Sequence, residues 1–234
     1  YIRFFTNYSK RSHDLEIIRS LKINIGGVAQ ISKERLLDEL KKIVKVESLE
    51  KLSKNKLSTD LMLMIFPELK NIKIFSRLNL DDKNLLKEKD FIFLLSLMII
   101  DDTDNTDYFL YKFNISKKDQ KRIKNIDIFY KEKINSKTFT KNSMNKVFYY
   151  QGKEAVLDIL NYRKVKSKKE ANLLKELSNY YEDKEAPIMP INANLLMKRY
   201  EIPQGKQLGE KLKVIEEEWV NNDLEKNKID TKGI

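Results

Sequence analysis

The sequence predicts an all-α fold, a multi-helix bundle followed by a small helical segment at the C-terminal end. Three observations favour it. The 234 residues include only 6 Gly and 4 Pro, and the tight turns of β-sandwiches and barrels need both residues. Apolar residues recur at helical spacing, and no segment alternates with the period of two expected of a strand. Hydrophobic residues make up 41% of the chain, which is enough for a folded core despite 35% charged residues.

The N-terminal segments are expected to be short helices. Residues Arg3 to about Tyr8 have the character of a helix end. A second helix is expected from Asp14 to about Ile23, where apolar residues return every three positions. Asn24 to Ile31 contains two adjacent glycines and is expected to be a loop.

The clearest helix start is ISKERLLDELKKIV, from Ile31 onward. Ser32 is the N-cap candidate, and Glu34 lies in the first turn, where the helix dipole favours a negative charge. Arg35 and Glu39 are spaced to interact on one face. The apolar face of this helix is formed by Leu36, Leu37, Leu40, Ile43 and Val44.

The remaining segments bring the expected total to eight to eleven helices. Pro67 ends one of them, while Pro187 and Pro190 make Ala186–Ile191 extended and the best internal boundary. The acidic stretch Asp101–Asp107 is expected to be a surface loop, because it lacks the glycine and terminal Glu of a Ca²⁺-binding loop. The further helices are expected at Glu47–Lys54, Ser58–Phe66, Asp81–Ile100, Ser116–Lys133, Asn142–Lys164 (divided near Gln151-Gly152), Ser167–Tyr181, Leu195–Tyr200 and Leu208–Asp223.

The net charge makes nucleic acid the natural class of partner. Lys and Arg total 46 against 35 Asp and Glu, which gives +11 and a pI near 9.4. AT-rich codon usage offers another reading, since 38 of these cations are Lys and only 8 are Arg. For each cluster a solvated helix face is the alternative to a binding role. The two basic clusters are Lys117, Lys118, Lys121, Arg122, Lys124 and Arg163, Lys164, Lys166, Lys168, Lys169.

The sequence lacks a recognisable catalytic or metal-binding set. It has no Cys, which excludes thiolate sites, and a single His, His13, which argues against His-ligated zinc and most His-based triads. We expect His13 to be exposed or to cap a helix, and Trp219 to pack in a core. No phosphate-binding glycine loop or nucleophile elbow occurs. Glu216–Glu218 are expected to form a solvated helix face.

The longest apolar run, Phe91–Ile100, is about half the ~20 residues that a membrane-spanning helix needs. No signal peptide is visible in the given sequence either. We therefore expect a cytoplasmic protein with no membrane partner.

Three segments, taken in chain order, are similar to the sequence motifs of one protein family. They are YIRFFTNYSK followed by ISKERLLDELKKI, then Phe66–Leu69 (FPEL), and finally APIMPINANLLMKRYEIPQGKQLGEKLKVIEEEWV. They resemble the class II tRNA nucleotidyltransferase and poly(A) polymerase family, the CCA-adding enzymes. Asn192-Ala193-Asn194 departs from the Gly-x-Asp type of turn that often occurs in that family. The matching positions are Arg3, Phe4, Ser32, Glu34, Arg35, Glu39 and Lys42 near the start, and Gly205, Leu208, Gly209, Leu212, Glu216 or Glu217, Trp219 and Val220 near the end.

The resemblance implies neck helices at residues 1–46, a helical body at 47–185 and a helical tail at 186–234. The chain starts at Tyr1 in what looks like the inside of a helix, so we expect it to be a piece of a longer protein. In the family, a catalytic head outside this sequence holds Mg²⁺ with two carboxylates and binds CTP or ATP. This chain would then have no catalytic residue and no cofactor of its own, and alone it would not polymerise nucleotides.

The resemblance also implies two sets of functional residues. Ser32, Glu34, Arg35 and Glu39 would support the neck beneath the nucleotide pocket. The body and tail would hold the acceptor–TΨC arm of tRNA, with the two basic clusters and the tail lysines Lys206, Lys211 and Lys213 as candidate contacts. Two alternatives stay open at this point, namely a poly(A) polymerase of the same family and a helical protein–protein adaptor with no RNA role.

Overall fold

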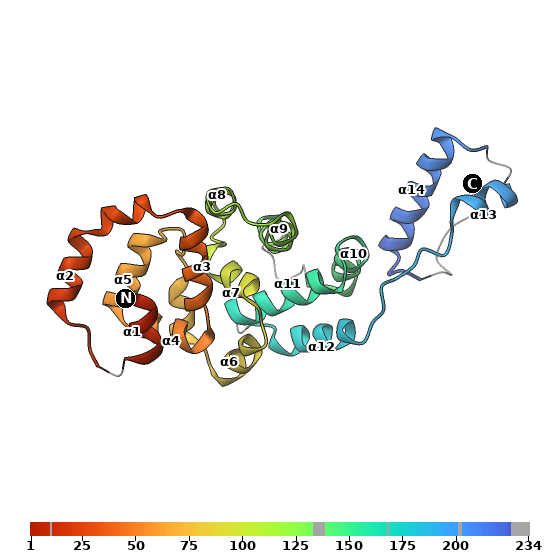
Figure 1. Ribbon diagram of the computed structural model, residues 1–234. Coiled ribbons are helices and arrows are strands. Elements are labelled where there is room, and N and C mark those ends of the chain that lie inside the picture. The colour runs from red at the N-terminus through yellow and green to blue at the C-terminus, as the bar shows by residue number, and fades with distance from the viewer. Residues whose placement is uncertain (10, 133–138, 168, 201–202, 226–234) are drawn as a thin grey trace. The chain divides into compact units, whose positions relative to one another are not determined.

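The computed structural model describes residues 1–9, 11–132, 139–167, 169–200 and 203–225 (Figure 1). In these residues it is helical without a strand, so the all-α prediction is confirmed. The chain divides into two compact units. The first comprises Tyr1–Glu132 with Tyr162–Lys169, and the second Lys133–Asn161 with Glu170–Ile234.

The first unit is built from nine α-helices and two 3-10 helices, together with the C-terminal end of helix α11 (Lys153–Lys166). They are α1 (Ile2–Tyr8), α2 (Leu15–Ile23), η1 (Ile25–Gln30), α3 (Lys33–Ile43), α4 (Val46–Lys54), α5 (Lys56–Ile65), η2 (Ile72–Arg77), α6 (Leu80–Lys87), α7 (Phe91–Ile99), α8 (Asn105–Lys112) and α9 (Lys117–Glu132).

Side chains of α4 hold the short helix α1 in place. Lys51 donates from Nζ to the carbonyl oxygen of Thr6 at 3.1 Å and to that of Phe5 at 3.3 Å. Ser48 donates to the side-chain oxygen of Asn7 at 2.7 Å. The last carbonyls of a helix have no partner within it, so the lysine supplies what α1 lacks at its C-terminal end.

Helix α7 forms the centre of the first unit. Eight of its nine residues are buried, as expected of a helix that is apolar on all sides. Asp90 begins it by accepting the backbone N–H of Phe93 at 3.0 Å. The prediction of one helix over Asp81–Ile100 was wrong, because this cap starts a new helix after α6 ends at Lys87.

Two asparagines satisfy the carbonyl groups at the C-terminal end of α7. Asn105 donates from Nδ2 to the carbonyl of Ile99 at 2.7 Å and to that of Glu68 at 2.8 Å. Asn71 donates from Nδ2 to the carbonyl of Ile100 at 2.6 Å. Asn105 also begins α8, so the loop predicted over Asp101–Asp107 ends earlier than expected.

The second unit contains α10 (Lys141–Gln151), most of α11 (Lys153–Lys166), α12 (Ala171–Glu182), α13 (Ala193–Tyr200) and α14 (Lys206–Asn221). Gly152, with φ of +91°, separates α10 from α11, so the predicted division at Gln151-Gly152 is confirmed. The buried Tyr181 of α12 donates from its hydroxyl to Asn145 Oδ1 on α10 at 2.7 Å. Trp219 of α14 is buried edge-on against Tyr149, 5.3 Å between ring centroids, as predicted for a core residue.

Two further expectations were wrong. The described residues contain fourteen α-helices and two 3-10 helices, more than the eight to eleven expected, and one of the additions is η1 at the glycine loop. His13 is buried rather than exposed or capping. Its ring stacks on that of Phe5, with 3.6 Å between the ring centroids. Its Nδ1 is hydrogen-bonded to Tyr1 Oη at 2.8 Å and its Nε2 to Ser58 Oγ at 2.7 Å.

In the described part of the chain, every helix is too short or too polar to cross a bilayer.

Candidate functional site

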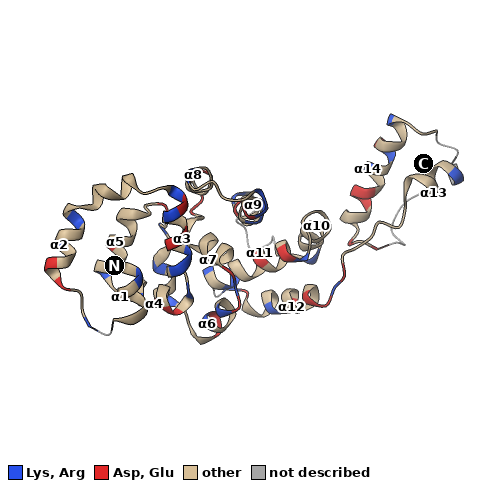
Figure 2. Ribbon diagram, viewed as in Figure 1, with Lys and Arg blue, Asp and Glu red and all other residues tan. Residues whose placement is uncertain are grey.

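The first basic cluster lies on α9, where Lys and Arg colour the helix in Figure 2. Lys117, Lys118 and Lys121 are exposed and form no ion pair with any described residue. Arg122 instead pairs with Asp90 before α7, and Lys124 pairs with Asp107 of α8 at 2.9 Å. The cluster therefore divides into three lysines that are available to a ligand and two cations, Arg122 and Lys124, that attach α9 to its neighbours.

The second basic cluster lies at the C-terminal end of α11, where cations complement the helix dipole. Arg163 and Lys164 are half-buried, while Lys169 is exposed. Lys166 places Nζ 5.4 Å from the ring of Tyr162. Lys166 is exposed as a whole residue, yet the surrounding protein displaces water and lowers the pKa of its ammonium, an effect that Asp102 and Asp101 oppose.

One member of this cluster, Lys168, lies outside the described residues.

The tail lysines lie on α14, which carries its lysines ahead of the acidic run near its end (Figure 2). Lys206 lies 3.6 Å from Glu210 and Lys213 lies 3.9 Å from Glu217, both at i,i+4 spacing. Lys211 is half-buried and forms no ion pair among the described residues. Exposed pairs of this kind are weak, on the order of 0.5 kcal/mol or less, so they do not prevent contact with a phosphate.

The predicted neck residues are all on or next to α3, but they behave differently. Ser32 caps the helix by accepting the backbone N–H of Arg35 at 3.3 Å, which confirms the predicted cap. The side chains of Glu34 and Arg35 are exposed and without an ion pair among the described residues. Glu39 is the residue that joins two helices, because its Oε2 forms an ion pair with Arg3 Nε on α1 at 2.8 Å.

Glu39 also accepts a hydrogen bond from Lys42 at 2.7 Å. That hydrogen bond, aided by the charge of Arg3, holds the pKa of the Glu39 carboxyl below its ordinary value. Glu39 is therefore a charged link between α1 and α3. A role of Ser32, Glu34 and Arg35 toward a nucleotide pocket stays a prediction.

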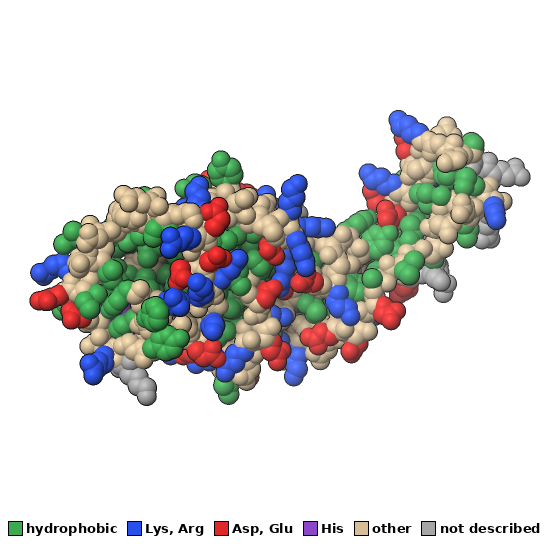
Figure 3. All heavy atoms as spheres, in the orientation of Figure 1, with side chains coloured by type: hydrophobic (Ala, Val, Ile, Leu, Met, Phe, Trp, Pro, Cys, Tyr) green, Lys and Arg blue, Asp and Glu red, His purple; other side chains and the backbone are tan. Residues whose placement is uncertain are grey.

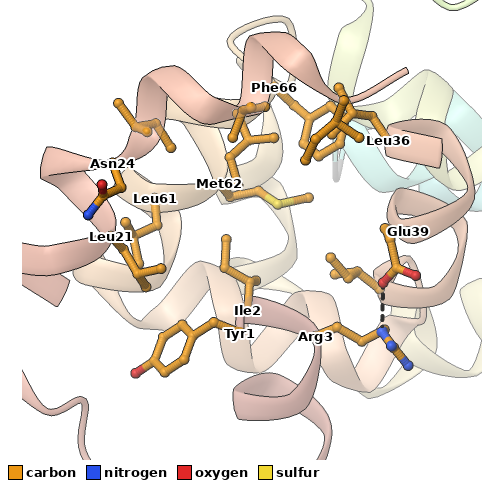
Figure 4. A pocket seen from close by; sticks show the side chains of 15 residues that line it. Tyr1, Ile2, Arg3, Leu21, Asn24, Leu36, Glu39, Leu61, Met62 and Phe66 are labelled. Atoms are coloured by element: carbon orange, nitrogen blue, oxygen red, sulfur yellow. Dashed lines mark ion pairs between the residues drawn. The ribbon is translucent and has the colours of Figure 1, made fainter. Parts of the chain in front are cut away.

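A pocket of about 310 Å³ opens beside the Arg3–Glu39 pair (Figure 4). Its walls come from α1, α2, η1, α3 and α5 and are almost entirely apolar, with Met62 and Ile2 among the side chains that reach into it. Only Arg3 and Glu39 bring formal charge to its lining. Such a cavity suits an apolar group and offers no pair of acid and base for catalysis.

A second hollow, of about 430 Å³, gathers basic residues that the sequence did not single out. Helix η2 contributes Lys73 and Arg77 to its lining, and Lys70 lies just before that helix. The fourth cation is Lys166 of the second basic cluster. No individual helix was predicted for residues 70–80, which were placed only in the helical body. The available signal was the three-residue spacing of Ile72 and Phe75, which is the period of a 3-10 helix.

Acidic residues do not gather into a metal centre. Among the described residues, no group of three or more His, Asp or Glu side chains is placed to hold an ion. The predicted surface loop at Asp101 instead uses its carboxylate locally, accepting from Thr103 and pairing with Lys70 at 2.9 Å.

Comparisons with known proteins give the family. The family described as tRNA nucleotidyltransferase domain 2 matches residues 84–229, more than half of the chain. Among solved structures, the CCA-adding enzyme of Bacillus stearothermophilus in complex with CTP is similar, with a TM-score of 0.59 and 15% sequence identity. The likeness covers 95% of this chain and 56% of that one, so the chain spans little more than half the length of that enzyme.

At 15% identity the structural likeness concerns the fold alone. Among curated proteins, none matches the sequence. The match over residues 84–229 is what carries the assignment, and it includes both basic clusters and the three tail lysines on α14. The chain belongs to the tRNA nucleotidyltransferase family.

Proposed function

We propose that this chain is the C-terminal RNA-binding portion of a CCA-adding tRNA nucleotidyltransferase. It would hold the acceptor–TΨC arm of tRNA while a head domain outside this sequence adds nucleotides to the 3′ end. The observation that carries the proposal is membership of the tRNA nucleotidyltransferase family together with the three exposed, unpaired lysines of α9. Because an A-form duplex presents phosphates and 2′-hydroxyls rather than readable base edges, dispersed lysines suit it.

The exposed apolar residues of the first two helices support a second part of the proposal. Phe4, Tyr8, Leu15 and Ile23 are 58%, 72%, 70% and 75% exposed, and hydrophobic side chains gather on the visible face in the region of α1 to α5 (Figure 3). Apolar patches of this kind mark surfaces that another protein part covers. We assign this face to the catalytic head, which would bring Mg²⁺ and bind CTP or ATP.

Within this proposal the neck residues have separate roles. Ser32 caps α3 and Glu39 links α3 to α1, while the exposed Arg35 is free to act toward the head. In the full-length enzyme, Arg35→Ala is expected to lower nucleotide addition without lowering the melting temperature. Unchanged turnover would remove Arg35 from the assignment. The cellular location that fits a tRNA-processing role is the cytoplasm.

The experiment that tests the proposal is binding of this chain to tRNA, to an acceptor–TΨC hairpin and to single-stranded RNA over a range of salt. We expect tRNA and the hairpin to bind more tightly than the single strand, with affinity falling as salt rises. The variant K117A/K118A/K121A is expected to weaken hairpin binding about tenfold or more. The matched control K22A/K33A/K56A removes three exposed lysines that have no ion pair among the described residues.

Weak and equal binding of all three RNAs would refute the proposal and favour a helical protein–protein adaptor. Selective hairpin binding would leave CCA addition and poly(A) addition to be separated by the product that the full-length enzyme makes.

A further inference from the structure

The hollow beside η2 is a built surface rather than a chance gathering of lysines. In a 3-10 helix, side chains three residues apart lie above one another, so the helix has three rows. Ile72 and Phe75 form one row and are fully buried. The other two rows face outward, and each carries one cation, Lys73 in one and Arg77 in the other. Burial of one apolar row therefore determines that both cations face out.

The elements that carry these cations are tied to a common point. Asn71, which precedes η2, donates from Nδ2 to the carbonyl of Ile100 at 2.6 Å and from its backbone N–H to the carbonyl of Met98 at 2.9 Å. Tyr162 of α11 directs its hydroxyl to the same Ile100 carbonyl at 3.5 Å. Lys166 follows one turn later on α11 and lines the hollow opposite η2. These bonds join the start of η2 and helix α11 to the end of α7, so the backbone positions that carry the cations are fixed relative to one another.

The side chains that line the hollow carry a net positive charge. Lys70 is partly neutralised, because its Nζ lies 2.9 Å from Asp101 Oδ2. Lys73 and Arg77 have no ion pair with a described residue. The one carboxylate in the lining, that of Asp82, accepts the backbone N–H of Asn79 at 3.2 Å as part of the cap of α6.

We propose that this hollow binds backbone phosphates of RNA, with Lys73, Arg77 and Lys166 as the donors. The proposal rests on the proposed function and adds to it a contact surface apart from the three lysines of α9. Guanidinium groups bind phosphate oxygens through two parallel hydrogen bonds, and ammonium groups add point charges. Ile74, Leu78 and Val165 of the lining are apolar, and the two polar side chains that could read a base, Asn71 and Asp82, hydrogen-bond to the protein backbone instead. The expected contact is therefore independent of base sequence.

The test compares two double variants in hairpin binding followed by fluorescence anisotropy at several salt concentrations. The variant K73A/R77A removes the two cations that η2 contributes to the hollow. The control K33A/K56A also removes two positive charges, from exposed positions on α3 and α5. We expect K73A/R77A to weaken binding at least fivefold and to reduce the slope of log affinity against log salt by about two, since two phosphate contacts are lost. The control is expected to weaken binding less than twofold.

Lys166 gives an independent arm. Lys166→Ala is expected to weaken hairpin binding, and Lys166→Arg, which keeps the charge, to restore it. Because Lys73 and Arg77 are exposed, the melting temperature of K73A/R77A is expected to match that of the wild type. Equal loss in K73A/R77A and K33A/K56A, with the preference for the hairpin intact, would overturn the hollow as a site while leaving the proposed function standing. If the wild-type chain shows no preference for the hairpin over single-stranded RNA, the proposed function itself is overturned.

Discussion

Glu68 and Lys112 form an ion pair whose removal has a predictable cost. The Glu68 side chain is 3% exposed, and its Oε1 lies 2.7 Å from Nζ of Lys112 on α8. Its other oxygen is buried without a hydrogen-bond partner among the described residues. Lys112→Met keeps the volume of the stem and removes the charge, so it leaves a buried carboxylate with no counter-charge.

The magnitude follows from the distance. At 2.7 Å and an effective dielectric constant of about 20, the attraction is about 6 kcal/mol, which desolvation of the two ions partly offsets. Breaking a buried pair costs about 3–5 kcal/mol. Because the Lys112 side chain is 23% exposed and water reaches it, we expect a loss of about 3 kcal/mol for Lys112→Met.

Urea unfolding followed by circular dichroism measures this loss. The double variant Glu68→Leu with Lys112→Met removes both charges and is expected to recover most of the stability. Lys70→Met serves as the control, since its ion pair with Asp101 is half exposed and is expected to cost less than about 1 kcal/mol. A loss below about 1 kcal/mol for Lys112→Met, or a double variant less stable than the single one, would refute the reasoning.

Three further perturbations test other parts of the structure. Burial lowers the pKa of His13, so the folded chain holds the neutral imidazole and its stability falls as the pH decreases below 6.5. His13→Gln is expected to flatten this decline, measured as the urea midpoint from pH 7.5 to pH 5.5. Burial raises the pKa of Asp127 although Lys131 pairs with it, so the ionised carboxylate costs stability as the pH rises above 3.8, and Asp127→Asn is expected to raise the melting temperature at pH 7 but not at pH 3. Tyr149→Phe removes the hydroxyl that donates to Glu216 and is expected to cost about 1.5–3 kcal/mol in urea unfolding.

Each of these has its own opposing result. A wild-type chain as stable at pH 5.5 as at pH 7.5 would contradict the account of His13. A melting temperature lowered by Asp127→Asn at pH 7 would mean that the pair with Lys131 outweighs the burial of the charge. Burial and Glu216 raise the pKa of Tyr149 to about 12, and burial also raises the pKa of Tyr162 and Tyr181, so Tyr149→Phe should leave one fewer late-ionising tyrosine than the wild type has. An unchanged number would contradict the account of Tyr149.

Much of the fold could be predicted because its signals are local. The cap at Ser32, the break at Gly152 and the apolar stripe that buries Trp219 each depend on a few neighbouring residues. The break between α6 and α7 is local too, but Asp90 lies among other charged residues and its capping role could not be told from a helix-surface role. His13 could not be placed, because the partners that bury it come from α1 and α5.

The candidate site was less predictable for the same reason. Lys121 and Arg122 are adjacent on α9 and look alike in the sequence, yet within the described part of the chain only Arg122 of the two meets a carboxylate, that of Asp90, 32 positions away. Charge composition cannot tell an ion-paired cation from an available one. The hollow beside η2 combines residues near position 75 with Lys166, so no sequence window contains it.

The all-apolar character of α7 has a consequence for how the chain behaves before it is folded. FIFLLSLMII is free of charge and of proline, and exposed segments of this kind associate with one another as strands. Charged residues stand on both sides, Lys87–Asp90 before it and Asp101-Asp102 after it, in the positions of gatekeepers that oppose such association. Asp90 and Asp101 thus combine two properties: their charge opposes association of the unfolded segment, and in the folded chain they form the cap of α7 and the ion pair with Lys70.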